Sequence, residues 1–250
     1  MALRTFLRTL GADAPKVETV LGGDRVRPGE ELPYTVTLHG GGADVELERL
    51  AVELIIRLED KEETESGWTD PHVLLENVLA GPYTLEAGEV RRLDGTFRLP
   101  WEMPFTHSRG LRVKGPRCAV RTRLEIDNAV DRGDFDEVEV HALPAQDAVL
   151  QAFAELGFRM EEAEVKAGML GNQKTQTLPF WQENEHWFPP AYNWGSGTEA
   201  QLEVAVITPG PDTVEVVTGA VETHVFTPAQ ILAPGWTDWL DRHCRGHFAR

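Results

Sequence analysis

The feature that most constrains this chain is the alternation of apolar and polar residues along its first half. Between residues 50 and 58 every second position is a large aliphatic residue: Leu50, Val52, Leu54, Ile56 and Leu58. The same period of two occurs at Leu32, Tyr34, Val36 and Leu38. Because successive side chains of a strand point to opposite faces, each stretch predicts a strand with one core face and one mostly solvated face.

Turn-forming residues divide the rest of this half into short strands. Residues 40–44 have the composition of a turn, and the charged residues 60–71 predict an exposed loop. Further strands are predicted at 73–79, 82–86, 90–99, 117–126 and 137–142. In a chain with 23 glycines and 16 prolines, such spacing is typical of an antiparallel β-sandwich, which we place over residues 14–143.

Helical spacing of apolar residues appears at three places. Residues 1–13 predict an amphipathic N-terminal helix that packs on its own domain, on a partner, or against a membrane surface. Residues 144–156 predict a linker helix that ends at Gly157. Residues 235–245 predict a C-terminal helix that docks within its own domain through one stripe: Trp236, Trp239, Leu240 and His243.

Strand patterns return beyond the linker helix, at 157–166, 176–187, 199–207, 212–218 and 220–226. We therefore place a domain boundary near residue 145 and a second β-sandwich, with the C-terminal helix, over residues 157–250. The predicted fold class is all-β, with two tandem immunoglobulin-like antiparallel sandwiches and short terminal and linker helices.

The formal net charge of −17 bears on the class of partner. A surface this acidic repels phosphate groups, so we expect no nucleic-acid partner and a preference for basic ones. Five basic residues nevertheless gather around one predicted strand, and we interpret them as offsetting acidic residues on neighbouring strands. They are Arg112, Lys114, Arg117, Arg121 and Arg123.

The sequence shows neither the pattern of a signal peptide nor that of a membrane-spanning helix. The N-terminus lacks the apolar core of a signal peptide, and no stretch approaches the roughly 18 apolar residues of a membrane span. The two cysteines, Cys118 and Cys244, fall in different halves of the chain. We expect a cytoplasmic protein with reduced thiols, and membrane contact at most peripheral, through the N-terminal helix.

Several strings in the first half resemble a known family by their order and spacing. They are KVETVL at 16–21, RPGEE at 27–31, YTLEAGE at 83–89, FRLP at 97–100, PFT at 104–106, LEIDNAVD at 124–131 and DFD at 134–136. Together they resemble the bacterial sporulation-control proteins, relatives of the arrestins. The resemblance covers residues 14–143, and more loosely ELGFR at 155–159. It departs from the family at Arg132, where an Asp-Pro pair is usual.

The resemblance implies two arrestin-like β-sandwich domains and a regulatory or scaffold role without catalysis, in sporulation, stress or cell-envelope control. Its partners would be other proteins, held by sheet edges or by the groove between the domains. A homodimer is the alternative to docking of the C-terminal helix within its own domain, because this helix could instead dock on another copy of the chain.

No recognised catalytic motif occurs, so we expect no enzyme activity, no cofactor and no metal. Two sets of side chains nevertheless have donor types that metals use. One is His243, Cys244 and His247, where the helix dipole already favours histidine. The other is a calcium-like cluster around Gly133 that ordinary turn chemistry also explains: Asp127, Asp131, Asp134 and Asp136.

Aromatic residues crowd the segment 180–194, and two more tryptophans lie on the C-terminal helix. The crowded residues are Phe180, Trp181, Trp187, Phe188, Tyr192 and Trp194. They pack on the core or on a partner, and we take the tryptophans as candidate partner contacts: Trp181, Trp187, Trp194, Trp236 and Trp239. Because aromatic rings also stack on sugars, the alternative function is a carbohydrate-binding module.

Overall fold

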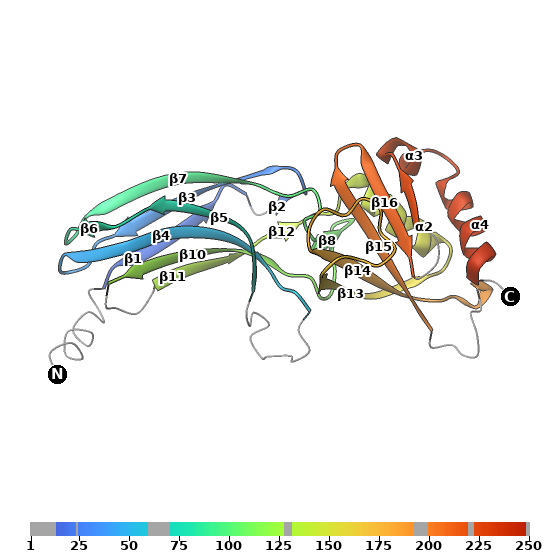
Figure 1. Ribbon diagram of the computed structural model, residues 1–250, viewed down its shortest axis with the longest axis horizontal. Coiled ribbons are helices and arrows are strands. Elements are labelled where there is room, and N and C mark those ends of the chain that lie inside the picture. The colour runs from blue at the N-terminus through green and yellow to red at the C-terminus, as the bar shows by residue number, and fades with distance from the viewer. Residues whose placement is uncertain are drawn as a thin grey trace.

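A computed structural model describes residues 14–23, 25–59, 71–127, 132–192, 200–219 and 223–248. Figure 1 shows two bodies placed end to end, with the strands of the first half on one side and the helices of the second half at the far end. The predicted N-terminal helix over residues 1–13 lies outside the described residues. None of the described helices has the length and apolar character that spanning a bilayer requires.

The first half is a sandwich of two antiparallel sheets. One sheet has the order β1 (Lys16–Leu21), β3 (Glu31–His39) and β7 (Val90–Arg98). The other has the order β11 (Arg132–Glu137), β10 (Cys118–Ile126), β4 (Val45–Ile56) and β5 (His72–Ala80), and β6 (Tyr83–Leu85) also pairs with β4. The alternating residues of β3 and β4 meet between the sheets and form the core, as the period of two predicts.

Strand β4 departs from the prediction of one solvated face. Ala51, Glu53 and Ile55 on its outer face are buried like the core residues between them. Arginines of the neighbouring strand β10 reach over this face, where Arg121 and Arg123 form ion pairs with Glu53. Long arginine side chains can bury the apolar surface beneath them while their charged ends stay wet.

The described strands after residue 156 form one five-stranded antiparallel sheet in sequence order. They are β13 (Arg159–Ala167), β14 (Phe180–Trp187), β15 (Gln201–Gly210), β16 (Thr213–Thr218) and β17 (Thr223–Phe226). The described helices are α2 (Pro144–Glu155), η1 (Pro190–Tyr192), α3 (Pro228–Leu232) and α4 (Trp236–Phe248).

The all-β class built from antiparallel sheets is confirmed, but the second half differs in one respect from the expected sandwich. Its second layer is helical, because the apolar stripes of α2 and α4 cover the inner face of the sheet. Val149 and Phe153 of α2 and Leu240 of α4 share one buried cluster with Leu202 and Val204 of β15. The helix expected as a linker is thus part of this core.

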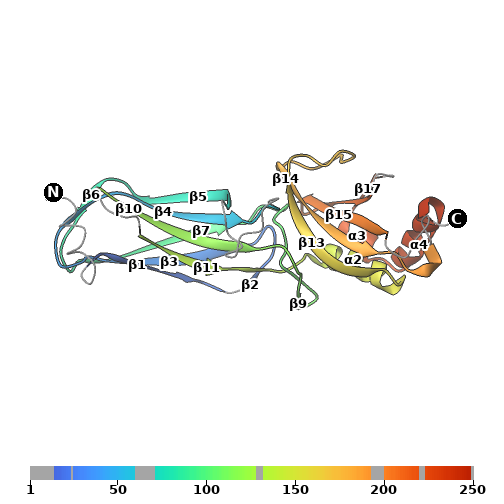
Figure 2. The same cartoon turned by 90° about the horizontal axis from the view of Figure 1, so that it is seen from below.

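The two halves meet through apolar packing and main-chain hydrogen bonds, which together we call the junction. Val165 of β13 and Phe180 of β14 belong to the buried cluster of the sandwich. The main chain of β13 continues the contact, since Ala163 N donates to Lys114 O at 2.9 Å and Val165 O accepts from Glu59 N at 2.7 Å. Figure 2 shows β13 and β14 on the side of the sheet nearest the sandwich.

Four very short strands lie at the same end of the sandwich. β2 (Arg25–Val26) pairs in parallel with β12 (Glu139–Val140), and β8 (His107–Ser108) forms a hairpin with β9 (Leu111–Arg112). β12 leads directly into α2, so the chain crosses between the halves at this point.

Candidate functional site: the carboxylate face of the C-terminal sheet

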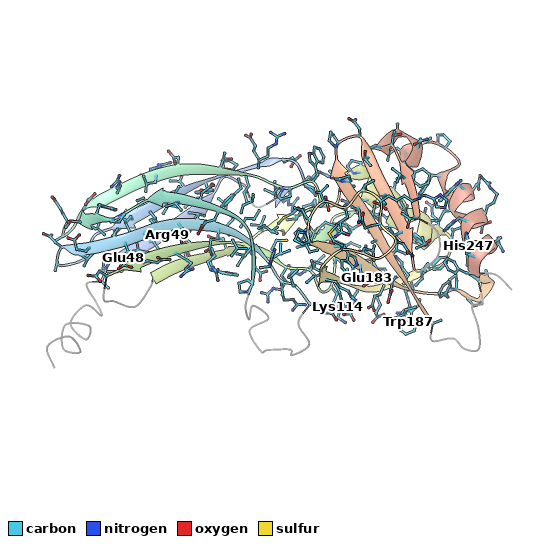
Figure 3. All side chains as sticks on the ribbon, viewed as in Figure 1. Glu48, Arg49, Lys114, Glu183, Trp187 and His247 are labelled. Atoms are coloured by element: carbon cyan, nitrogen blue, oxygen red, sulfur yellow. The ribbon has the colours of Figure 1, made fainter. Side chains whose placement is uncertain are left out.

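The outer face of the C-terminal sheet carries a set of glutamates that the strand register brings together. Opposite the helices, Glu164 of β13 lies beside Glu183 of β14, while Glu162, Glu185 and Glu203 form the next row across β13, β14 and β15. We call these five residues the carboxylate face. Figure 3 labels Glu183. Like charges on directly opposed strand positions repel each other, so this face concentrates negative charge.

Lys166 lies at one edge of the carboxylate face, in the row next to Glu164 and Glu183. Its Nζ lies 2.8 Å from Glu183, 3.3 Å from Glu164 and 3.8 Å from Glu59. Burial lowers the pKa of Lys166, but the hydrogen bonds and charges of these carboxylates outweigh it and raise that pKa overall. Lys114 adds a second ion pair, to Glu162 at 2.8 Å. Five carboxylates with two lysines leave an excess of negative charge.

Glu183 shows what this crowding does to a carboxyl group. Its side chain is 8% exposed, and burial followed by the neighbouring Glu203 raises its pKa from 4.5 to about 7, against the opposing effect of Lys166. The pKa of Glu185 is also raised, first by burial and then by Glu164 and Glu162. The part of each shift that comes from neighbouring carboxylates shows repulsion between negative charges, which added positive charge at this face would reduce.

The segment 168–179 bounds the carboxylate face on one side. Glu215 of β16 is buried, and its carboxylate accepts hydrogen bonds from the main-chain N–H groups of Lys174 and Thr175. The ammonium group of Lys174 donates to Thr223 O at 2.6 Å. Glu215 is therefore satisfied internally and serves to fasten this segment to the sheet.

The predicted contact tryptophans fall on opposite sides of this sheet. Trp181 and Trp187 belong to the outer face with Glu183. Trp181 packs beside Ala205, Ile207 and Val217, whereas the indole N–H of Trp187 donates to Glu161 at 3.1 Å. Trp187 thus reaches a charged side chain at the end of the carboxylate face, and Trp181 is held by apolar packing.

Trp236 and Trp239 lie on the helical side. Trp236 is buried, and the two rings stack with centroids 4.9 Å apart. Trp239 in turn stacks on His243 at 5.3 Å. Trp236 shares a buried cluster with Phe153 of α2 and Val204 of β15, which confirms that the C-terminal helix docks within its own domain. Trp194 lies outside the described residues.

The other aromatic residues of the crowded segment contribute to packing. Phe180 and Tyr192 are buried, and the Tyr192 hydroxyl donates to Asp241 of α4. Phe188 packs against Phe158 and Phe248, with ring centroids 5.4 Å away in each case. These rings hold the segment to the helices.

The two metal candidates from the sequence are not assembled among the described residues. Cys244 is buried in the core and His243 bonds Thr218 at 2.8 Å, so these side chains face different neighbours. Asp134 accepts hydrogen bonds from Thr19 N and Phe135 N, while Asp131 lies outside the described part of the chain.

The basic residues near β10 are paired with acids, which confirms their predicted role. Arg121 and Arg123 pair with Glu53, and Arg112 and Arg117 pair with Glu137. Lys114 pairs with Glu162 of the second half.

Sequence reasoning missed the carboxylate face, although part of its signal was visible. Glutamates recur at positions 162 and 164 and again at 183 and 185, each pair at the spacing of one strand face. Which strands lie beside each other, and in what register, was needed to join them into one surface.

Comparisons with known proteins agree with this architecture. The family model described as SpoOM protein matches residues 3–220. The sporulation-control protein spo0M of Bacillus subtilis (strain 168) is 33% identical over 178 residues, a match that covers 70% of this chain and 64% of the relative. The match therefore spans less than two thirds of that relative's length.

The crystal structure of Spo0M, the sporulation control protein from Bacillus subtilis, superposes with a TM-score of 0.72 at 25% identity. The superposition covers 93% of this chain and 98% of that one. The family match over most of the sequence and this agreement of fold lead to one conclusion: the chain belongs to the SpoOM protein family.

Proposed function

We propose that this chain is a non-enzymatic regulatory protein that acts by binding other proteins in the cytoplasm. Family membership and the name of the curated relative support a role in sporulation control or in a related stress or cell-envelope response. The two cysteines are free and buried in separate cores, which suits a reducing compartment.

We propose the carboxylate face as the surface that binds the partner. Glu203 is exposed and Glu162, Glu164 and Glu185 are half-buried, whereas Glu183 is buried. The first four side chains can therefore reach a partner that binds this side of the sheet. Burial is the first cause of the raised pKa values of Glu183 and Glu185, and the neighbouring carboxylates raise these pKa values further. A partner segment rich in lysine or arginine would supply the missing charge and bind in a salt-dependent way.

The proposal is tested by neutralising the face without altering its shape. The variant Glu164→Gln/Glu185→Gln/Glu203→Gln keeps side-chain size but removes three charges. We expect it to weaken binding of a partner identified by affinity purification by about tenfold, because charge complementarity contributes to association. Binding would be measured with purified proteins at two salt concentrations.

The matched control is Glu18→Gln/Glu48→Gln/Glu86→Gln, which removes the same charge from exposed positions on the sandwich; Figure 3 labels Glu48 on β4. This control should bind the partner like the wild type. If both variants lost the same affinity for the partner, the effect would come from the net charge of the protein and not from the carboxylate face. If the variant of the carboxylate face bound the partner like the wild type, this face would not be the binding surface.

A further inference from the structure

A second cluster of chemically active side chains lies away from the carboxylate face, where the chain crosses between the halves. It consists of His107 on β8, Glu139 on β12 and His141 immediately after β12. Figure 1 places β8 and β12 between the sandwich and the C-terminal sheet. Among the described residues this is the group of three side chains whose ligand atoms converge, all within 4.8 Å of one another.

The backbone holds these three residues in fixed relative positions. His107 and His141 form a parallel bridge, in which His107 O accepts from Ala142 N at 2.8 Å. His141 N donates to Val26 O, also at 2.8 Å. Glu139 and His141 are two residues apart on one extended segment, so their side chains leave on the same side.

The distances between the ligand atoms match the needs of a small cation. His141 Nε2 lies 3.2 Å from one Glu139 oxygen, and His107 Nε2 lies 3.8 Å from the other. Metal bonds of about 2.0–2.1 Å in tetrahedral geometry separate two ligands by about 3.3 Å. The two imidazole rings stack with centroids 5.0 Å apart and an interplanar angle of 18°, so rotation of the histidine side chains would bring all three groups onto one ion.

The surroundings of His107 orient its ring for this role. Its Nδ1 lies 2.9 Å from the Thr106 hydroxyl oxygen, which also accepts a hydrogen bond from Val140 N at 3.0 Å. When the hydroxyl hydrogen is directed to Val140 O, His107 Nδ1 donates to Thr106 and its Nε2 presents a lone pair to the cluster. Metal-binding histidines characteristically have their second nitrogen held by such a partner.

One cation already competes for the carboxylate. Arg25 Nε lies 3.4 Å from Glu139, and the Arg25 side chain is 70% exposed. An exposed ion pair of this kind contributes little free energy, so the arginine can move into solvent when a metal ion takes its place.

We propose that His107, Glu139 and His141 form a site for a divalent transition-metal ion, with Zn²⁺ as the best fit, that fastens β8 to β12 at the crossing between the halves. Two imidazole nitrogens and one carboxylate are characteristic zinc donors. Three protein ligands leave a fourth position for water or a partner's side chain. Glu139, at 40% exposed, keeps the site open to solvent.

The test uses the full chain freed of metal with a chelator and then titrated with Zn²⁺ and Co²⁺. Calorimetry should give about one ion per chain, and the visible spectrum of bound Co²⁺ reports on nitrogen and oxygen ligands in a tetrahedral site. Because the ion binds the folded state, saturating Zn²⁺ should also raise the melting temperature. Glu139→Gln and His141→Gln should each weaken binding by about tenfold or more.

Two further variants distinguish this site from histidines elsewhere in the chain. His243→Gln/His247→Gln removes the half-buried histidines of α4 and should leave binding intact, whereas Arg25→Gln should strengthen it by removing the competing cation. Circular dichroism checks that each variant is folded. The proposal is overturned if the wild type binds no ion, or if the cluster variants bind like the wild type while the α4 variant loses binding.

Discussion

At the scale of single residues, Glu183 shows how burial and a neighbouring carboxylate together raise the pKa of a carboxyl group. It lies between Lys166, which pairs with it at 2.8 Å, and Glu203, which repels it. The net result is a pKa raised from 4.5 to about 7, led by burial. The folded protein therefore holds a proton that the unfolded chain releases at lower pH.

This shift predicts how stability depends on pH. The stabilising contribution of the Glu183 proton is complete below pH 4.5 and is lost as the pH rises through about 7. In Glu203→Gln the repelling charge is absent, so the pKa of Glu183 falls and the loss of stability between these values becomes smaller. Urea unfolding at pH 5 and pH 8 measures the difference, with Glu86→Gln as the control. An unchanged difference in the Glu203 variant would contradict this account of the pKa.

At the scale of elements, helix α4 shows how a short amphipathic segment completes a domain. Trp236, Leu240, Cys244 and Phe248 are buried at successive turns and face the cluster formed by α2 and the sheet. Trp239 and His243 flank this stripe and stack on one another. The helix thus supplies the second layer that a sheet would supply in a sandwich.

A core substitution in α4 tests this role. Leu240 is fully buried, so Leu240→Ala should cost about 2–5 kcal/mol through lost contacts and the cavity left behind. For a chain of this size that corresponds to a fall in melting temperature on the order of 10 °C. Leu232→Ala on α3, where the side chain is 54% exposed, should change it little. Similar effects of the two variants, measured by calorimetry with mass determined in solution, would argue against α4 as a core element.

At the scale of the whole molecule, the junction determines whether the two halves move as one. The sandwich contributes the loop around Gly115, and the sheet contributes β13. Gly115 has a φ of +110°, and a Cβ atom there would lie 1.9 Å from Ala163 O. Glycine is needed at this position both for its backbone conformation and for the close approach of the two halves.

Gly115→Ala should therefore loosen the junction. Gly110→Ala is the matched control, because Gly110 also has a positive φ, of +79°, but a Cβ atom would meet no atom within 4 Å. Both variants carry backbone strain of about 1–2 kcal/mol, and only Gly115→Ala also breaks the contact with β13. We expect faster proteolysis between the halves and a lower melting temperature for Gly115→Ala than for the control. Equal behaviour of the two variants would mean that the junction tolerates the added atom.

The sequence by itself determined the features that depend on neighbouring residues. The period of two located β3 and β4, the helical stripes located α2 and α4, and the strings at 16–136 indicated the family. It also indicated that the arginines of β10 offset acids. These properties are local because strand and helix periodicity are set by how successive side chains point.

Only the tertiary structure decided the features that join distant segments. Glu164, Glu183 and Glu203 become one surface through pairing across three strands. His107 meets His141 through a bridge between segments 34 residues apart in sequence. The sequence also did not determine which elements pack on the apolar face of the C-terminal sheet, because such a face can be buried by helices as well as by strands. Strand order and layer partners depend on the free energy of packing the whole chain, which no local pattern contains.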